Sequence, residues 1–191
     1  MYKIPDEFLG GARKDLVSDD IRHMAHAIIT SMGSEDPSTQ VGARYVSSDG
    51  ILLSEGFNTA LWEQERFPYG GDIEKMGIEN TKYPYINHAE IMGVLNYRGP
   101  LTDFKGATLY VTLRPCENCA RFVASLGVKR IVCLNERIYN EKDTTGVIID
   151  NCHIEYMNQK DSLKVKKIIL DFTANEKNNV QVLKYINNEK K

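Results

Sequence analysis

The stretch ATLYVTLRPCENCARFVASLGVKRIVCL, residues 107–134, decides the fold class. Its first seven residues are a nearly continuous apolar run, which predicts a strand of the kind found in buried sheets. Residues 116–127 predict a helix that ends at Gly127, and residues 130–134 predict another strand. A helix between two such strands is typical of an α/β protein, in which helices pack on the faces of a sheet.

The chain on either side continues this pattern. Residues 18–33 predict an amphipathic helix, and residues 41–57 predict a hairpin with a turn at 48–50. The expected strands of the hairpin cover 41–47 and 51–57, and further elements are a helix at 87–97, a helix at 141–151 and a strand at 153–157. Residues 58–86 form a long connection, which in a compact domain is functional or holds short elements of its own. This order predicts an α/β layered sheet with helices on both faces.

Length and charge limit the classes of protein. The 191 residues predict an N-terminal segment 1–17, a domain 18–158 and a lysine-rich C-terminal extension 159–191. The net charge of −2, from 24 basic and 26 acidic residues, gives no global attraction to nucleic acid or to an anionic membrane. No apolar run approaches the ~20 residues that span a bilayer, and the first residues do not resemble a signal peptide. We therefore expect a cytoplasmic protein without membrane or nucleic-acid partners.

The four cysteines fall into two groups. Cys116 and Cys119 form a C-x-x-C pair, which in a reducing compartment indicates metal or redox chemistry. Cys133 and Cys152 lie in apolar or strand-like runs, so we expect them to be ordinary buried thiols.

The C-x-x-C pair has the spacing of two metal ligands. Pro115 is suited to open a helix, and residues three apart share one helix face, so both thiolates of Cys116 and Cys119 can reach one ion. Backbone N–H groups at the start of a helix stabilise thiolates. His88, at the start of an earlier helix, offers a third ligand. One imidazole and two thiolates leave a fourth tetrahedral position open, which is typical of catalytic rather than structural zinc.

Glu90 lies two residues after His88, too close to serve comfortably as a further ligand. A carboxylate at this place is suited to move protons to and from a water that zinc activates. The alternatives are a structural zinc site and a chance arrangement. The combination H-x-E…P-C-x-x-C is a known signature of zinc deaminases.

At these residues the sequence resembles the cytidine/deoxycytidylate deaminase family, and within it the deoxycytidylate (dCMP) deaminases most of all. The segments that carry the resemblance are EDPSTQVGA at 35–43, TKYPYINHAE at 81–90 and GATLYVTLRPCENCA at 106–120. The resemblance implies a three-layer α/β/α cytidine-deaminase-like fold with a mixed five-stranded sheet. It also implies hydrolytic deamination of dCMP to dUMP for thymidylate supply. In this reading zinc (Zn2+) is held by His88, Cys116 and Cys119, and Glu90 carries the protons.

Three further residues match positions that contact the nucleotide in the family. Asn58, in EGFN, matches the family's G-Y-N segment, although asparagine also suits a turn at the end of a strand. Gly42 and Ala43 match a small pair that lets the base approach the first strand, although glycine is also found in strands at bulges. The resemblance therefore implies that Asn58, Gly42 and Ala43 bind the substrate.

Two departures leave the exact nucleotide open. The family's G-Y-N-G-x-P continues here as GFNTALW, in a loop that carries regulatory contacts, so dCTP and dTTP as effectors stay open. The family's H-A-E-L-N-A is HAEIMGV here, with Met92 at the asparagine position, and HAEIM also occurs in tRNA adenosine deaminases. The alternatives are a related zinc deaminase acting on another cytosine or modified nucleotide, and a catalytically silent binding protein with this fold.

A nucleotide substrate also needs a cation for its phosphate. The candidates near the motifs are Arg44, Arg66, Lys82 and Arg114, and each alone is expected to be a solvated surface charge. The family resemblance further implies a homo-oligomer.

Overall fold

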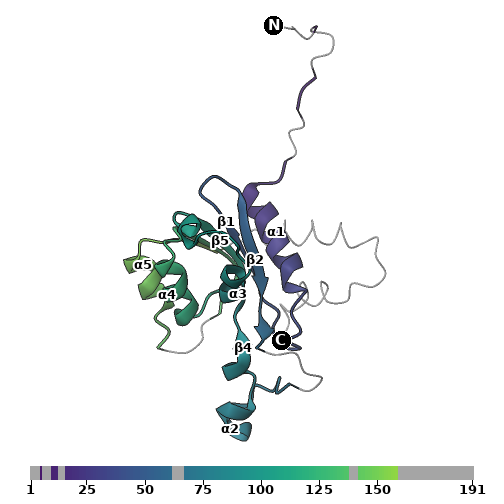
Figure 1. Ribbon diagram of the computed structural model, residues 1–191, viewed down its shortest axis with the longest axis vertical. Coiled ribbons are helices and arrows are strands. Elements are labelled where there is room, and N and C mark those ends of the chain that lie inside the picture. Colours follow the sequence, from purple (N-terminus) through teal and green to yellow (C-terminus); the bar gives the residue numbers. More distant parts are fainter. Residues whose placement is uncertain (1–4, 6–9, 13–15, 62–66, 138–141, 159–191) are drawn as a thin grey trace, which may run out of the picture.

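The computed structural model describes residues 5, 10–12, 16–61, 67–137 and 142–158 (Figure 1). The predicted C-terminal extension, 159–191, lies outside the described residues, as does most of the predicted N-terminal segment. All of the elements below belong to the predicted domain.

The centre of the fold is a five-stranded sheet with the strand order β2-β1-β5-β6-β7. The strands are β1 (Gly42–Val46), β2 (Leu52–Phe57), β5 (Thr108–Leu113), β6 (Arg130–Asn135) and β7 (Glu155–Asn158). β1 runs antiparallel to β2 and β5, whereas β5, β6 and β7 are parallel to one another. The sheet is therefore mixed, which confirms the expectation drawn from the family resemblance.

Helices cover both faces of this sheet (Figure 1). One face carries α1 (Asp19–Ser31), and the other carries α3 (Ala89–Leu95), α4 (Glu117–Ser125) and α5 (Thr145–Asn151). Strand residues alternate between the two cores: Leu109 and Val111 belong to the cluster with α3 and α4, while Tyr110 belongs to the α1 cluster. The predicted three-layer α/β/α architecture is confirmed.

Helix α1 lies very close to strand β1. The Ser18 hydroxyl caps the helix by accepting from the Ile21 N–H at 3.3 Å. A Cβ atom added at Gly42 would lie 1.9 Å from the Ala27 carbonyl oxygen. Position 42 therefore needs glycine because the backbone of α1 occupies the space that a side chain would take.

Two arginine side chains from the sheet also form hydrogen bonds with residues of α1. Arg44, 8% exposed, donates from Nε to His23 Nδ1 at 3.1 Å and pairs with Glu55. The expectation of a solvated surface charge is wrong for Arg44, because its strand position faces α1 and not solvent. Arg130 donates both Nη groups to Asp20 at 2.6 and 2.7 Å, and the hydrogen bonds from Arg130 lower the pKa of Asp20.

The long connection from 58 to 86 holds short elements of its own, as predicted. They are β3 (Thr59–Ala60), α2 (Ile73–Met76), the 3₁₀ turns Ile78–Asn80 and Tyr83–Tyr85, and β4 (Ile86–Asn87). β3 and β4 pair as a small antiparallel ribbon, so this connection returns to the domain directly before His88. A further 3₁₀ turn, Leu101–Phe104, precedes β5.

Two smaller expectations are corrected by the structure. The predicted helix 141–151 begins only at Thr145, because the Asp143 carboxylate accepts from the Thr145 N–H at 2.9 Å and forms a turn there. Cys133 is buried as expected, but Cys152 is exposed, since it follows the last turn of α5 instead of lying in a strand. None of the helices that the structure describes has the length and apolar character needed to cross a membrane.

Candidate functional site

Three predicted ligands meet at the start of two helices. His88 directly precedes α3, Cys116 directly precedes α4, and Cys119 lies in the first turn of α4. His88 Nδ1 lies 3.5 Å from Cys116 Sγ and 3.4 Å from Cys119 Sγ. One ligand atom from each residue lies within 4.8 Å of the others, close enough for one ion to contact all three.

The local structure explains why these side chains face one another. His88 and Cys116 both occupy the position before the first helical residue, where serine, threonine or aspartate caps many helices. Neither side chain caps its own helix, although the backbone bonds of the first turns are in place, from Met92 to His88 and from Ala120 to Cys116. The two side chains are therefore available to a ligand between the helices.

The electrostatics of the cluster favour thiolate at Cys116. The hydrogen bond from Cys119, together with that from His88, lowers the pKa of Cys116 to about 4. The hydrogen bond with Cys116, reinforced by burial, raises the pKa of Cys119. A thiolate is the form that binds metal, and one imidazole with two sulfurs is a donor set that suits zinc.

Glu90 is held beside this cluster in the first turn of α3. It is only 3% exposed, and burial raises the pKa of its carboxyl group. The Tyr45 hydroxyl donates to the Glu90 carbonyl oxygen at 2.9 Å and fixes the backbone there. A buried carboxyl group with a raised pKa is suited to take up and release a proton.

A pocket of about 470 Å³ opens onto the cluster. Its size falls in the range of small-molecule sites, roughly 300–1,000 Å³. The residues that line it are Asp36, Ser38, Thr39, Val41, Asn58, Gly71, Lys82, Tyr83, Ile86, His88, Ala89, Glu90, Leu113, Arg114, Cys116 and Arg137. The pocket is therefore lined by two of the three candidate metal ligands, by Glu90 and by two of the cations proposed for a phosphate, Lys82 and Arg114.

The three predicted substrate contacts occupy different places. Asn58 lines the pocket, and its side chain accepts from the Val41 N–H at 2.7 Å and donates to the Thr39 carbonyl at 2.9 Å. Gly42 and Ala43 are not among the lining residues: Gly42 packs against α1, and Ala43 is fully buried in the core. Asn58 therefore shapes the pocket wall, and its contact with a nucleotide stays a prediction.

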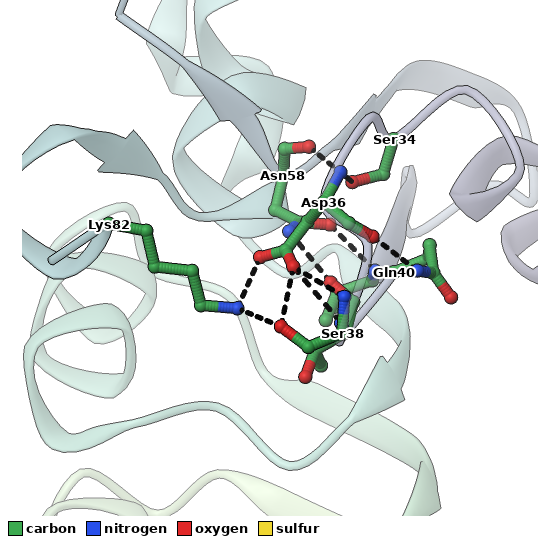
Figure 2. A network of polar contacts seen from close by, with 8 residues as sticks. Ser34, Asp36, Ser38, Gln40, Asn58 and Lys82 are labelled. Atoms are coloured by element: carbon green, nitrogen blue, oxygen red, sulfur yellow. Dashed lines mark hydrogen bonds and ion pairs between the residues drawn. The ribbon is translucent and has the colours of Figure 1, made fainter. Parts of the chain in front are cut away.

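A polar network in the pocket wall joins the candidate cation Lys82 to Asp36 and Ser38, which the sequence did not single out. Lys82 donates from Nζ to Asp36 Oδ2 at 2.6 Å and to Ser38 Oγ at 2.7 Å (Figure 2). At 8% exposure Lys82 is not the solvated surface charge expected, because Asp36 pairs with it in the interior. Burial alone would raise the pKa of Asp36, but hydrogen bonds from Lys82 and Ser38 lower it overall. The sequence marked Asp36 and Ser38 only as part of EDPSTQVGA, one of the segments that carry the family resemblance, in which Asp, Pro and Ser also favour a turn.

Arg114 stands at another part of the pocket, anchored by acids. Its Nη1 donates to the Arg137 carbonyl at 3.2 Å and pairs with Asp143, and its Nε lies 3.6 Å from Glu136. Burial tends to raise the pKa of Asp143, but hydrogen bonds from Thr145 and Arg114 lower it to about 2. The last candidate cation, Arg66, lies outside the described residues.

Comparison with known proteins identifies the family. The profile of the cytidine and deoxycytidylate deaminase zinc-binding region matches residues 17–135, more than half of the chain. The chain belongs to this deaminase family. Its His88, Glu90, Cys116 and Cys119 all fall within the matched region, and the resemblance drawn from the sequence is confirmed.

Individual members of the deaminase family support the assignment. Deoxycytidylate deaminase of Mus musculus is 30% identical over 153 residues, covering 79% of this chain and 84% of the relative. The apo crystal structure of dCMP deaminase from cyanophage S-TIM5 shares the fold, with a TM-score of 0.54 and 22% identity over 73% of this chain and 96% of that one.

A third similar protein is named for a different reaction. The diaminohydroxyphosphoribosylaminopyrimidine deaminase/5-amino-6-(5-phosphoribosylamino)uracil reductase of Thermotoga maritima has a TM-score of 0.55 and 26% identity. The match covers 81% of this chain but only 40% of that one. The deaminase fold therefore also occurs in a protein named for the deamination of a phosphoribosylaminopyrimidine.

Proposed function

We propose that this protein is a zinc-dependent deaminase that converts dCMP and water to dUMP and ammonia. The observation that carries the proposal is one pocket lined by Glu90, two of the three candidate zinc ligands and buried or anchored cations. A nucleotide fits such a pocket, because it carries a reactive base at one end and a phosphate, which needs a cation, at the other. The curated relatives named deoxycytidylate deaminase point to the same substrate.

His88, Cys116 and Cys119 would hold the zinc ion. When bound, zinc would lower the pKa of a coordinated water toward ~7. The three ligand atoms lie close enough to share one ion, and their imidazole and thiolate chemistry suits it. The cluster also leaves room for substrate, because His88 and Cys116 line the pocket.

Glu90 would move the protons of the reaction. Its carboxylate takes a proton from the attacking water, delivers one to N3 of cytosine and helps the amino group leave C4 as ammonia. Its burial and the raised pKa fit a group that must be found in both protonation states. The apolar residues Val41, Ile86 and Leu113 in the pocket wall would contact the base and exclude other water.

A substrate panel tests the proposal. Purified protein with measured zinc content is assayed for ammonia release from dCMP, CMP, deoxycytidine, dCTP and free cytosine. We expect dCMP to be turned over with the highest kcat/KM. An inert dCMP beside turnover of another compound in the panel would refute dCMP as the substrate while leaving deaminase chemistry intact.

A second candidate substrate is another aminopyrimidine nucleotide. It is favoured by the Thermotoga maritima relative and by Met92, which stands where dCMP deaminases have asparagine. The phosphoribosylaminopyrimidine named for that relative is therefore added to the panel. Its turnover beside inert dCMP would favour this second candidate.

The wider roles expected from the family are part of the same proposal. The dUMP formed would supply thymidylate synthesis in the cytoplasm, and the protein would act as a homo-oligomer. Repeating the dCMP assay with added dCTP or dTTP tests whether either nucleotide changes the rate.

A further inference from the structure

Lys82 is a buried cation at the edge of the substrate pocket. Its side chain is 10% exposed, and that of its partner Asp36 is 3% exposed. An ammonium group has three N–H donors. Within the described residues, Asp36 Oδ2 and Ser38 Oγ account for two of them (Figure 2). The third donor can serve a ligand in the pocket that Lys82 lines.

The carboxylate of Asp36 neutralises the ammonium group of Lys82 only in part, because other donors also bind this carboxylate. Its Oδ1 atom accepts from the Ser38 N–H at 2.9 Å, the Ser38 hydroxyl at 2.9 Å and the Thr39 N–H at 3.2 Å. These three donors stabilise the negative charge of Asp36 in addition to the hydrogen bond from Lys82. This part of the pocket wall therefore contains one carboxylate, that of Asp36, and both of its oxygens accept hydrogen bonds from neighbouring donors.

The other candidate cations are less suited to an anionic ligand. Arg44 is not a lining residue, because it faces α1 and bonds to His23 and Glu55. Arg114 lines the pocket but is held between two carboxylates, those of Asp143 and Glu136. Two negative groups beside one cation repel a phosphate dianion, whereas Lys82 has one such neighbour.

We propose that Lys82 binds the 5′-phosphate of the substrate and that Asp36 and Ser38 are positioning residues, which hold its ammonium group toward the pocket. The inference rests on the proposed function, since it concerns the phosphate of a nucleotide bound with its base near Glu90. Lys82 thereby becomes the residue that distinguishes a nucleotide from its nucleoside.

The test compares substrates with and without the phosphate in matched variants. Removing Lys82 alone would leave Asp36 buried and unpaired, which can unfold a protein. We therefore compare Asp36→Asn, which keeps the ammonium group, with the double variant Asp36→Asn/Lys82→Met, which removes it. Lys105→Met, an exposed lysine outside the pocket lining, controls for the loss of one surface charge. Zinc content and thermal unfolding verify that each variant is folded.

The measured quantity is kcat/KM for dCMP divided by kcat/KM for deoxycytidine. A charge-assisted hydrogen bond contributes enough that its loss lowers this ratio about 10- to 100-fold. We expect that decrease in the double variant relative to its Asp36→Asn background. Asp36→Asn itself should lower the ratio less, because it keeps the ammonium group but loses the carboxylate that positions it. Lys105→Met should leave the ratio unchanged. Binding of dUMP and deoxyuridine, measured by calorimetry, should show the same selective loss for dUMP.

Each outcome has a separate meaning. If the double variant lowers both substrates equally, or neither, Lys82 does not bind the phosphate and the inference is overturned. If it lowers turnover of dideoxy-CMP less than that of dCMP, Lys82 reads the 3′-hydroxyl group instead, which also overturns it. A wild-type protein that does not turn over dCMP at all refutes the proposed function, independently of the variants.

Discussion

At the scale of single residues, Glu90 is the side chain whose chemistry can be removed with the least change in shape. The variant Glu90→Gln keeps the volume but cannot accept a proton. We expect turnover of dCMP to fall about 10²- to 10⁴-fold, the usual contribution of general acid–base catalysis. Zinc content should stay unchanged, because the three candidate ligands are untouched. Metal analysis and an ammonia assay measure the two effects, with exposed Glu79→Gln as the control. Loss of zinc from Glu90→Gln would instead assign Glu90 to the metal.

Gly93 is one of the positions at which this chain departs from the family sequence, and packing against Tyr45 accounts for it. The family pattern H-A-E-L-N-A has alanine at this place, whereas here a Cβ atom would lie 2.8 Å from Cε2 of Tyr45. Tyr45 is fully buried, so its ring has little room to move. The glycine in HAEIMGV is therefore required by a tyrosine on β1, and this position carries no information on the substrate.

Changing Gly93 and Tyr45 together tests this packing. We expect Gly93→Ala to lower the free energy of unfolding by about 1–3 kcal/mol, the usual effect of overpacking, even though alanine is the better helix former. In the background of Tyr45→Val, which removes the ring, Gly93→Ala should cost much less. Urea unfolding of the four proteins gives the coupling energy. Strictly additive effects would show that the ring does not limit position 93.

At the scale of elements, the sequence predicted what local patterns determine. Apolar runs, caps and glycine stops predicted α1, α3, α4 and the five strands of the sheet, and two short motifs predicted which side chains meet between α3 and α4. Pairings between distant segments carry no such local signal. Lys82 and Asp36 are 46 positions apart, and Arg44 and His23 are 21 apart, so their burial depends on how the elements pack.

The contact between α1 and β1 predicts a pH dependence of stability. His23 is buried, and its Nδ1 accepts a hydrogen bond from Arg44, which a protonated imidazole could not do. Burial, followed by the charge of Arg44, lowers the pKa of His23 below its ordinary value of 6.5. The unfolded chain therefore binds a proton more readily than the folded one. The stability contributed by neutral His23 is complete above pH 6.5 and is lost as the pH falls from there through the folded pKa.

Thermal unfolding between pH 7.5 and 5 measures this effect. His23→Gln can still accept from Arg44 but does not titrate, so its midpoint should fall less on acidification than that of the wild type. His26→Gln, three residues further along the same helix and exposed, is the matched control and should follow the wild type. If all three proteins lose stability in parallel, His23 is not the group that titrates.

At the scale of the whole molecule, the site lies where two separate parts of the chain come together. His88 ends the long connection that follows the hairpin, whereas Cys116 and Cys119 follow the central strand β5. α3 packs mainly on β2 and β1 and α4 against α5, with fewer contacts between α3 and α4 themselves. An ion bound by His88 and the two cysteines would therefore join two parts of the α-helical layer that packing alone joins less extensively.

Zinc removal should for this reason lower the stability of the whole domain. Free zinc at 100 times its dissociation constant stabilises a folded protein by about 2.7 kcal/mol, which for a chain of this size raises Tm by about 5–10 °C. We expect chelation to remove that increment from the wild type and from Glu90→Gln alike. Cys116→Ser, which removes a ligand, should melt at the lower temperature with or without added zinc. Cys152→Ser alters an exposed thiol outside the cluster and should keep the full zinc response. If Cys116→Ser still gained stability from zinc, the ion would bind at another site. The proposed zinc-dependent reaction at this cluster would then be refuted.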